Sequence, residues 1–167
     1  EHDAALLRAC AMLMVHCERL VPLLRPHCRE THFVEHYTRY ALPEMADYKE
    51  DGFVLWIGHV QYLPYLLQWL VHHPIGREVR LLTDIDSEKG WLRARDNAAR
   101  LGLPSDLPDA ARTLGGHAVF RWSERRQQEM MRACKAAIDV KHTELFSQHH
   151  KPPTKVQQYV ASGIPCA

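Results

Sequence analysis

Two lysines and a threonine surround the expected start of the last helix. The stretch reads HHKPPTKVQQYVA, and its spacing predicts a helix over Val156–Ala161 that is preceded by two prolines. Pro153 suits a first helical position, because the amide hydrogen that proline lacks has no intrahelical partner there. Helix-start amides and the positive end of the helix dipole bind anions. The groups expected to hold a diphosphate are Lys151, Thr154, Lys155 and Val156. The alternative is a solubilising cap on a surface helix.

A second candidate loop, Gly58-His59-Val60-Gln61, follows the apolar run FVLWI. Gly58 either lets the backbone approach a ligand closely or only makes a tight turn. His59 either contacts phosphate or an acceptor, or packs within the loop. Because neither a G-x-G-x-x-G fingerprint nor a Walker A motif is present, a nicotinamide or flavin enzyme is disfavoured.

The bulk composition is that of an ordinary globular protein, with 46% apolar and 25% charged residues. The formal charge of +1 gives no global attraction to nucleic acid, so any anion site must be local. The five cysteines form no C-x-x-C pair, which fits a reducing cytoplasm rather than a disulfide framework or a zinc ribbon. No run approaches the roughly 20 apolar residues that span a bilayer. We expect a cytoplasmic protein, with attachment to the inner face of the membrane left open.

The chain divides into two regions. The N-terminal quarter reads as strand, short helix and strand, with strands at Ala11–Cys17 and Thr31–Tyr37 and with Pro26 closing the helix. The charged segment Thr38–Gly52 has no clear periodicity and is typical of a linker. We therefore assign residues 1–42 to the end of one domain and the start of the linker, 43–52 to the linker, and 53–167 to a second domain. Glu1 at the start and an apolar run at the end suggest a piece of a longer protein.

In the second region, short apolar runs alternate with amphipathic segments. Expected strands lie at residues 53–57, 78–83, 117–122, 135–140 and 163–167, and expected helices lie between them. Ser87 and Ser123 are the predicted N-caps of two helices, and Gly102 the predicted end of one. Apolar strands separated by helices predict an α/β fold with a doubly wound, Rossmann-like parallel sheet that is buried on both faces.

This architecture predicts where the ligand lies. In an open α/β sheet, ligands bind beyond the carboxyl ends of the strands, where the strand order reverses. With the common strand order, the strands at 53–57 and 135–140 flank that point. Their following loops are 58–61 and 141–154, so Gly58, His59 and the lysines around Pro153 should lie at one edge.

The same residues resemble those of a known family. The tail KPPTKVQQYVASGIPCA is similar to the donor-binding segment of GT-B fold glycosyltransferases, and its end matches at Ala161, Ser162, Gly163 and Pro165. FVLWIGH resembles the first strand and glycine loop of that domain, and VFRWSERRQQEMMRACKAAIDV resembles a later strand, turn, helix and strand. The resemblance covers residues 53–167, and Ala11–Tyr37 resembles the last βαβ unit of the preceding acceptor domain.

The resemblance implies transfer of a sugar from a nucleotide-diphosphate-sugar donor to a carbohydrate, lipid-linked or protein acceptor, without a metal or another cofactor. The diphosphate would lie on the helix start, and peripheral membrane contact would come from the absent part of the acceptor domain. The nucleotide base and ribose would lie near four residues: Arg121, Trp122, Ser123 and Gln158.

The sequence also departs from the family pattern. Many retaining members place two glutamates eight positions apart, where this chain has His150 and Gln158. Retaining or inverting chemistry therefore stays open, and the fragment is expected to be inactive alone because a catalytic base would lie in the absent part. The alternatives are a non-catalytic α/β regulatory or interaction module and a nucleotide-sugar epimerase of GT-B architecture.

Two patterns could indicate a metal. Asp84-Ile85-Asp86 spells the D-x-D sequence that binds a divalent cation in another glycosyltransferase fold, the GT-A fold. Here it follows a predicted strand and precedes Ser87, so we expect a role at a helix start. The adjacent pairs His72-His73 and His149-His150 point in different directions on a helix or strand, and no H-E-x-x-H motif is present. The sequence therefore predicts no metal site.

Overall fold

The computed structural model describes residues 2–35, 37–86, 88–103, 112–142 and 144–167. They form two compact units, one from Glu1–Tyr37 with Lys141–Thr154 and one from Thr38–Val140 with Lys155–Ala167. Both units combine helices and strands, which confirms the predicted α/β class. Of the two predicted N-caps, Ser123 can be compared with the structure, whereas Ser87 lies outside the described residues.

The first unit contains the predicted βαβ unit, with shorter elements than expected. Its members are α1 (His2–Ala9), β1 (Leu13–Val15), α2 (Leu20–Leu24), β2 (Thr31–Phe33) and α6 (Phe146–His149). β1 and β2 are parallel, in a register that pairs Leu13 with Thr31. α2 ends two residues before Pro26, as the proline predicted. The sequence did not predict α1 and α6.

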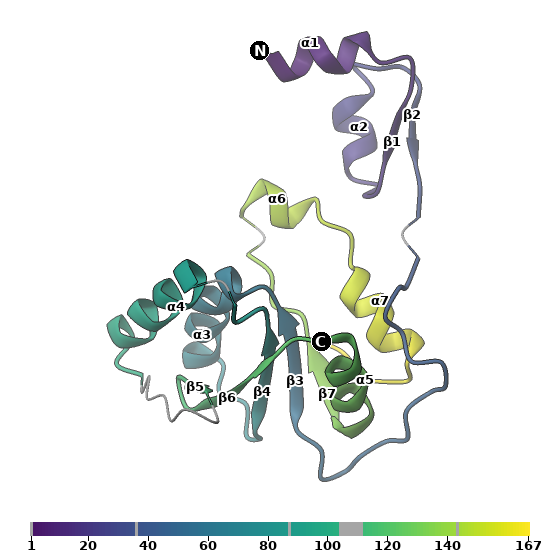
Figure 1. Cartoon of the computed structure of the whole chain (residues 1–167). Coiled ribbons are helices and arrows are strands. Elements are labelled where there is room, and N and C mark those ends of the chain that lie inside the picture. Colours follow the sequence, from purple (N-terminus) through teal and green to yellow (C-terminus); the bar gives the residue numbers. More distant parts are fainter. Residues whose placement is uncertain (1, 36, 87, 104–111, 143) are drawn as a thin grey trace. The chain divides into compact units, whose positions relative to one another are not determined.

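The second unit is built on a five-stranded sheet (Figure 1). The strands are β3 (Val54–Gly58), β4 (Val79–Thr83), β5 (Arg112–Leu114), β6 (His117–Arg121) and β7 (Ala136–Ile138). Their order is β5-β6-β4-β3-β7, and the four strands β6, β4, β3 and β7 are parallel to one another. The predicted parallel core is therefore confirmed. β5 was not predicted and is antiparallel to β6, so the sheet is mixed.

The expected last strand, residues 163–167, runs beside β7 without forming a regular strand. Cys166 makes an isolated parallel bridge with Ala137. The amide of Ala137 donates to the carbonyl of Pro165 at 2.8 Å, and that of Asp139 donates to Ala167 at 2.9 Å. The predicted fifth strand is therefore only an isolated bridge, although these residues do pair with the sheet.

The helices of the second unit follow the sequence pattern closely. They are the 3₁₀ turn η1 (Val60–Tyr62), α3 (Leu63–His72), α4 (Glu88–Arg100), α5 (Glu124–Ala133) and α7 (Thr154–Ala161). The hydroxyl of Ser123 accepts a 3.2 Å hydrogen bond from the amide of Arg126, which confirms it as the N-cap of α5. Gly102 has φ +67° just after α4, the left-handed conformation that often ends a helix.

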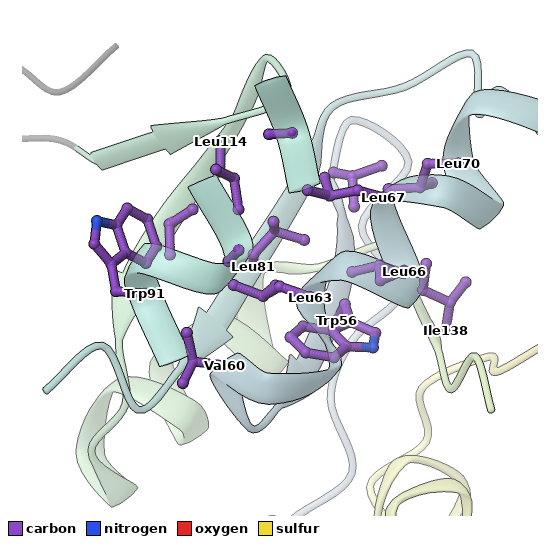
Figure 2. Packing of buried hydrophobic residues seen from close by; sticks show 14 of the residues in the cluster. Trp56, Val60, Leu63, Leu66, Leu67, Leu70, Leu81, Trp91, Leu114 and Ile138 are labelled. Atoms are coloured by element: carbon purple, nitrogen blue, oxygen red, sulfur yellow. The ribbon is translucent and has the colours of Figure 1, made fainter. Parts of the chain in front are cut away.

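Side chains from β3 alternate between two apolar cores. Val54 and Trp56 join the core beneath α3 and α4, which Figure 2 shows around Trp56, Leu63 and Leu66. Leu55 and Ile57 join the opposite core, beneath α5 and α7. Helices therefore cover both faces of the sheet (Figure 1), which explains why the central strand β3, with the sequence VLWIG, has apolar side chains on both faces.

The segment expected to be a linker is part of the second unit. Residues 38–53 contain no helix or strand, yet Leu42 is buried in the core beneath α5 and α7. The amide of Leu42 donates to the hydroxyl of Ser162 at 2.9 Å, and the amide of Ala46 donates to the carbonyl of Ser162 at 2.8 Å. This irregular segment is therefore anchored to the turn after α7.

Candidate anion site at the carboxyl edge of the sheet

The strand order reverses between β3 and β7. From β3 the chain adds β4 and then β6 on one side, and it returns to place β7 on the other side of β3. The register pairs Trp56 of β3 with Ile138 of β7. The first and fourth predicted strands thus flank the point where open α/β sheets bind ligands, as the sequence predicted.

Gly58 is the last residue of β3, and the space left by its missing side chain is filled by Trp56. A Cβ atom on Gly58 would lie 2.1 Å from Cζ2 of the Trp56 ring and 2.2 Å from its Cη2. Trp56 is only 2% exposed, so the ring has little freedom to move. Glycine at this position therefore accommodates the buried indole.

Lys155 lies at the same strand end. Its Nζ donates a hydrogen bond to the carbonyl oxygen of Ile57, the residue before Gly58. The ammonium is also 5.7 Å from the centroid of the Trp56 ring, within the range of a cation–π contact. The side chain is half-buried. A positive charge thus stands beside the end of β3, at the point of strand reversal.

Tyr159 fixes the helix that presents this lysine. It lies one turn after Lys155 on α7 and is fully buried in the core beneath α5 and α7. Burial raises the pKa of Tyr159 well above the usual range, with further contributions from Asp139 and the neighbouring thiols of Cys166 and Cys134. Because residues four apart share a helix face, the neutral, buried Tyr159 keeps Lys155 directed toward β3.

His59 and Asp84 form a pair at this edge. Asp84 follows β4, and its Oδ2 lies 3.2 Å from Nδ1 of His59. Its Oδ1 accepts from the amide of Val60 at 2.7 Å and from the hydroxyl of Thr83 at 3.1 Å. Partial burial alone would raise the pKa of Asp84, but the hydrogen bonds from Val60 and His59 lower it below its usual value. Asp84 is therefore ionised at neutral pH.

Asp84 holds the start of a different helix from the one expected. The D-x-D pattern suggested a role next to Ser87, at the start of α4. Instead, the hydrogen bond from Val60 places Asp84 at the start of η1, which leads directly into α3. The expected role next to Ser87 stays a prediction, because Ser87 lies outside the described residues, whereas the contact that the structure describes is with η1.

Three predicted nucleotide-contacting residues lie at the last residue of β6 and directly after it. β6 is two strands away from β3, which corresponds to about 10 Å. Nη2 of Arg121 lies 2.9 Å from Oδ2 of Asp86. Trp122 donates through Nε1 to Gln127 at 2.8 Å, and its ring meets Tyr40 edge to face at 5.9 Å. Ser123 caps α5. The Trp122 side chain remains 39% exposed, so part of its ring is open to solvent.

The remaining predicted contacts fall in both units. Lys151 and Thr154 lie in the first unit, whereas Val156 and Gln158 lie in the second. Lys151 is exposed, and the hydroxyl of Thr154 donates weakly to the carbonyl of Pro152 at 3.4 Å. Gln158 is only 7% exposed, and its backbone carbonyl accepts from the hydroxyl of Ser162 at 2.6 Å. Within the second unit, the edge of β3 therefore gathers Gly58, His59 and Lys155.

Two residues of this edge were missed as members of the site. Trp56 was predicted only as part of an apolar strand, and Asp84 was expected to have a role at the start of the following helix. The position of Asp84 directly after a buried strand could have indicated a site residue. Its partner, His59, could not be inferred, because that depends on which strand lies next to β4. Within the described ranges, no three histidine, cysteine, aspartate or glutamate side chains are grouped so that they could hold a metal ion.

The sequence matches no model of a known protein family, and no curated protein sequence matches it significantly. In the described part of the chain, no helix is both long enough and apolar enough to cross a membrane. The fold and the residues of the site are therefore the basis for the functional proposal.

Proposed function

We propose that this chain supplies the donor-binding part of a GT-B glycosyltransferase, which transfers a sugar from a nucleotide-diphosphate-sugar to an acceptor. The observation that supports this most is the position of Lys155, whose ammonium binds the carbonyl of Ile57 at the reversal point of the sheet. A half-buried cation at that point favours an anionic ligand. The GT-B resemblance over residues 53–167 supplies the class of that ligand.

In this proposal the protein stabilises the departing nucleoside diphosphate. Negative charge develops on the diphosphate as the bond to the sugar breaks, and preorganised cations and amides lower the barrier by stabilising that charge. Lys155 and the backbone amides of Lys155 and Val156 are the proposed stabilisers in the second unit. Lys151 and Thr154 are added on the basis of the sequence alone. These groups would neutralise the phosphates without a metal ion.

The other contacts are assigned by the same resemblance. The exposed part of the Trp122 ring is proposed to contact the nucleotide base, with Arg121 and Ser123 beside it. Gln158 takes the place of a glutamate that binds the ribose in many family members. The protein is proposed to work in the cytoplasm, with the acceptor domain making any contact with the membrane.

The strand order argues against one alternative. A response-regulator-like module has the order 2-1-3-4-5, whereas the four parallel strands here place the first between the second and the fourth. A GT-B epimerase would use the same donor site. Analysis of the products formed from a bound nucleotide-sugar, with and without an acceptor, would separate an epimerase from a transferase.

Calorimetry with UDP, GDP, ADP and CMP derivatives tests the proposal. One of them should bind, and Lys155→Ala and Lys151→Ala should each weaken binding by about 1.5–3 kcal/mol, the cost of a lost hydrogen bond to a charged group. Lys49→Ala is the matched control, because that exposed lysine lies 3.9 Å from Asp47 and before β3 rather than after it.

Two results would contradict the proposal. One is the absence of binding by any of these nucleotides to the wild-type protein, also when they are screened by thermal shift, where binding raises the apparent stability. The other is a nucleotide affinity that both Lys155→Ala and Lys151→Ala leave equal to that of the Lys49→Ala control.

A further inference from the structure

The carboxylate of Asp84 is bound to two consecutive residues of the loop after β3. Its Oδ1 accepts from the amide of Val60 at 2.7 Å, and its Oδ2 faces Nδ1 of His59 at 3.2 Å. The hydroxyl of Thr83 adds a third hydrogen bond at 3.1 Å. Asp84 thus fixes both the path of the loop and the orientation of the His59 ring.

This contact distinguishes the two ring nitrogens of His59. Because ionised Asp84 is only an acceptor, Nδ1 of His59 carries a hydrogen, and Nε2 is the nitrogen left for another molecule. The His59 side chain is 63% exposed, and the Tyr62 ring lies against it edge to face at 6.2 Å. In neutral His59, Nε2 is an acceptor. In protonated His59, Nε2 becomes a donor that points away from Asp84.

The charges around His59 favour an anion as that other molecule. Lys155 places its ammonium on the carbonyl of Ile57, two residues before His59 in the sequence. Of the nearby carboxylates, Asp84 is bound to the loop itself and Asp86 is paired with Arg121 at 2.9 Å. Asp139 follows β7, on the other side of β3.

We propose that Asp84 is a positioning residue that holds His59 so that its protonated Nε2 binds a diphosphate oxygen. The inference rests on the proposed donor site and adds a pH-dependent contact to it. Protonation turns Nε2 of His59 from an acceptor into a donor, so diphosphate binding should strengthen as the pH falls. In neutral His59, Nε2 offers a lone pair to the anion and the contact is lost.

Titration calorimetry with inorganic pyrophosphate at pH 5.5, 7.0 and 8.5 tests this contact. The ligand's own protonation cancels when variants are compared at the same pH. Wild type should bind roughly 10-fold or more tightly than His59→Gln at pH 5.5, the value of a hydrogen bond between charged groups, and about equally at pH 8.5. His72→Gln is the matched control, since His72 ends α3 about 15 Å along the helix from its start.

Asp84→Asn separates positioning from a purely structural role. The amide oxygen of the substituted side chain can still accept from the amide of Val60, but its NH₂ group then faces Nδ1 of His59 and makes that nitrogen the acceptor. The hydrogen of neutral His59 moves to Nε2, so the pH dependence of pyrophosphate binding should flatten. If the carboxylate only stabilised the fold, Asp84→Asn would lower the stability of the protein and leave the pH dependence of pyrophosphate binding unchanged.

Nitrogen-15 NMR of the ligand-free protein supplies a readout that does not depend on binding. At pH 8.5, His59 should carry its hydrogen on Nδ1 in wild type and on Nε2 in Asp84→Asn. The opposite tautomer in wild type, or equal pH profiles of wild type and His59→Gln, would overturn the inference. If nucleotides bind through Lys155 while His59→Gln has no effect, the inference alone fails. If no nucleotide and no pyrophosphate binds, the proposed function fails with it.

Discussion

Residues at the end of β3 can serve a ligand, the packing of the strand, or both. Lys155 offers a charge at the reversal point while also binding the strand end through the carbonyl of Ile57. Gly58 was expected to serve either a ligand or a tight turn, and the geometry shows that it makes room for the Trp56 ring. Glycine in a sequence indicates that space is needed, but only the fold shows what fills that space.

The contact between Gly58 and Trp56 predicts a stability difference between two glycines. In Gly58→Ala the new Cβ would lie 2.1 Å from a buried, rigid ring, so the substitution should destabilise the protein by about 1–3 kcal/mol. Gly76→Ala is the control, because a Cβ there meets nothing within 4 Å. Urea unfolding of both variants measures the difference. Equal midpoints would show that the Trp56 ring can move aside.

Secondary structure elements were predictable where their sequence pattern was long. α3 (Leu63–His72) lies between two expected strands, as predicted, and its pattern was clear because four leucines share one buried face: Leu63, Leu66, Leu67 and Leu70. β5 was missed because its sequence, Arg-Thr-Leu, contains no apolar run. The Gly115-Gly116 pair between β5 and β6 was the available signal, since both glycines have positive φ, as a two-residue hairpin turn requires.

The site was predictable only in part, for a physical reason. The lysine at the helix start and the glycine loop could be inferred because each belongs to one local pattern. The Asp84–His59 pair joins the ends of two neighbouring strands, and it depends on the register that aligns Gly58 with Thr83. Strand neighbours and register are set by packing across the whole sheet, so a local pattern does not reveal them.

The N-cap of α5 allows a test at the scale of one element. Ser123→Ala removes the hydroxyl that accepts from the amide of Arg126, so the protein should lose about 1 kcal/mol of stability. Ser123→Asp keeps an acceptor and adds charge at the positive end of the helix dipole, and should retain the wild-type stability. Thermal unfolding followed by circular dichroism compares the two, and a loss in both variants would argue against the cap.

At the scale of the whole molecule, the two units differ in how much apolar surface they bury. Among the described residues of the first unit, only β1 and β2 pair as strands, and Met14 and Phe33 on these strands are 73% and 45% exposed. Its α2 has no buried residue. In the second unit, β3 and β4 lie between two cores. Two paired strands alone have little stability in water.

Hydrogen exchange should reveal this difference. Amides of β1 and β2 are expected to exchange faster than those of β3 and β4, because local opening costs less where few apolar contacts are lost. Mass spectrometry of peptides from the two regions measures it directly. Equal protection in both sheets would mean that the first unit is stabilised by more than its own contacts.

The anchoring of residues 38–53 determines where the protein can be cut without damage. A truncation that begins at Phe53, at the boundary suggested by composition, would remove Leu42 from its core and take both amide donors away from Ser162. Ser162 is fully buried, so its hydroxyl and carbonyl would lose partners at a newly opened surface. A dissected second domain should therefore begin before Leu42, and the irregular segment is better regarded as a strap of that domain than as a spacer.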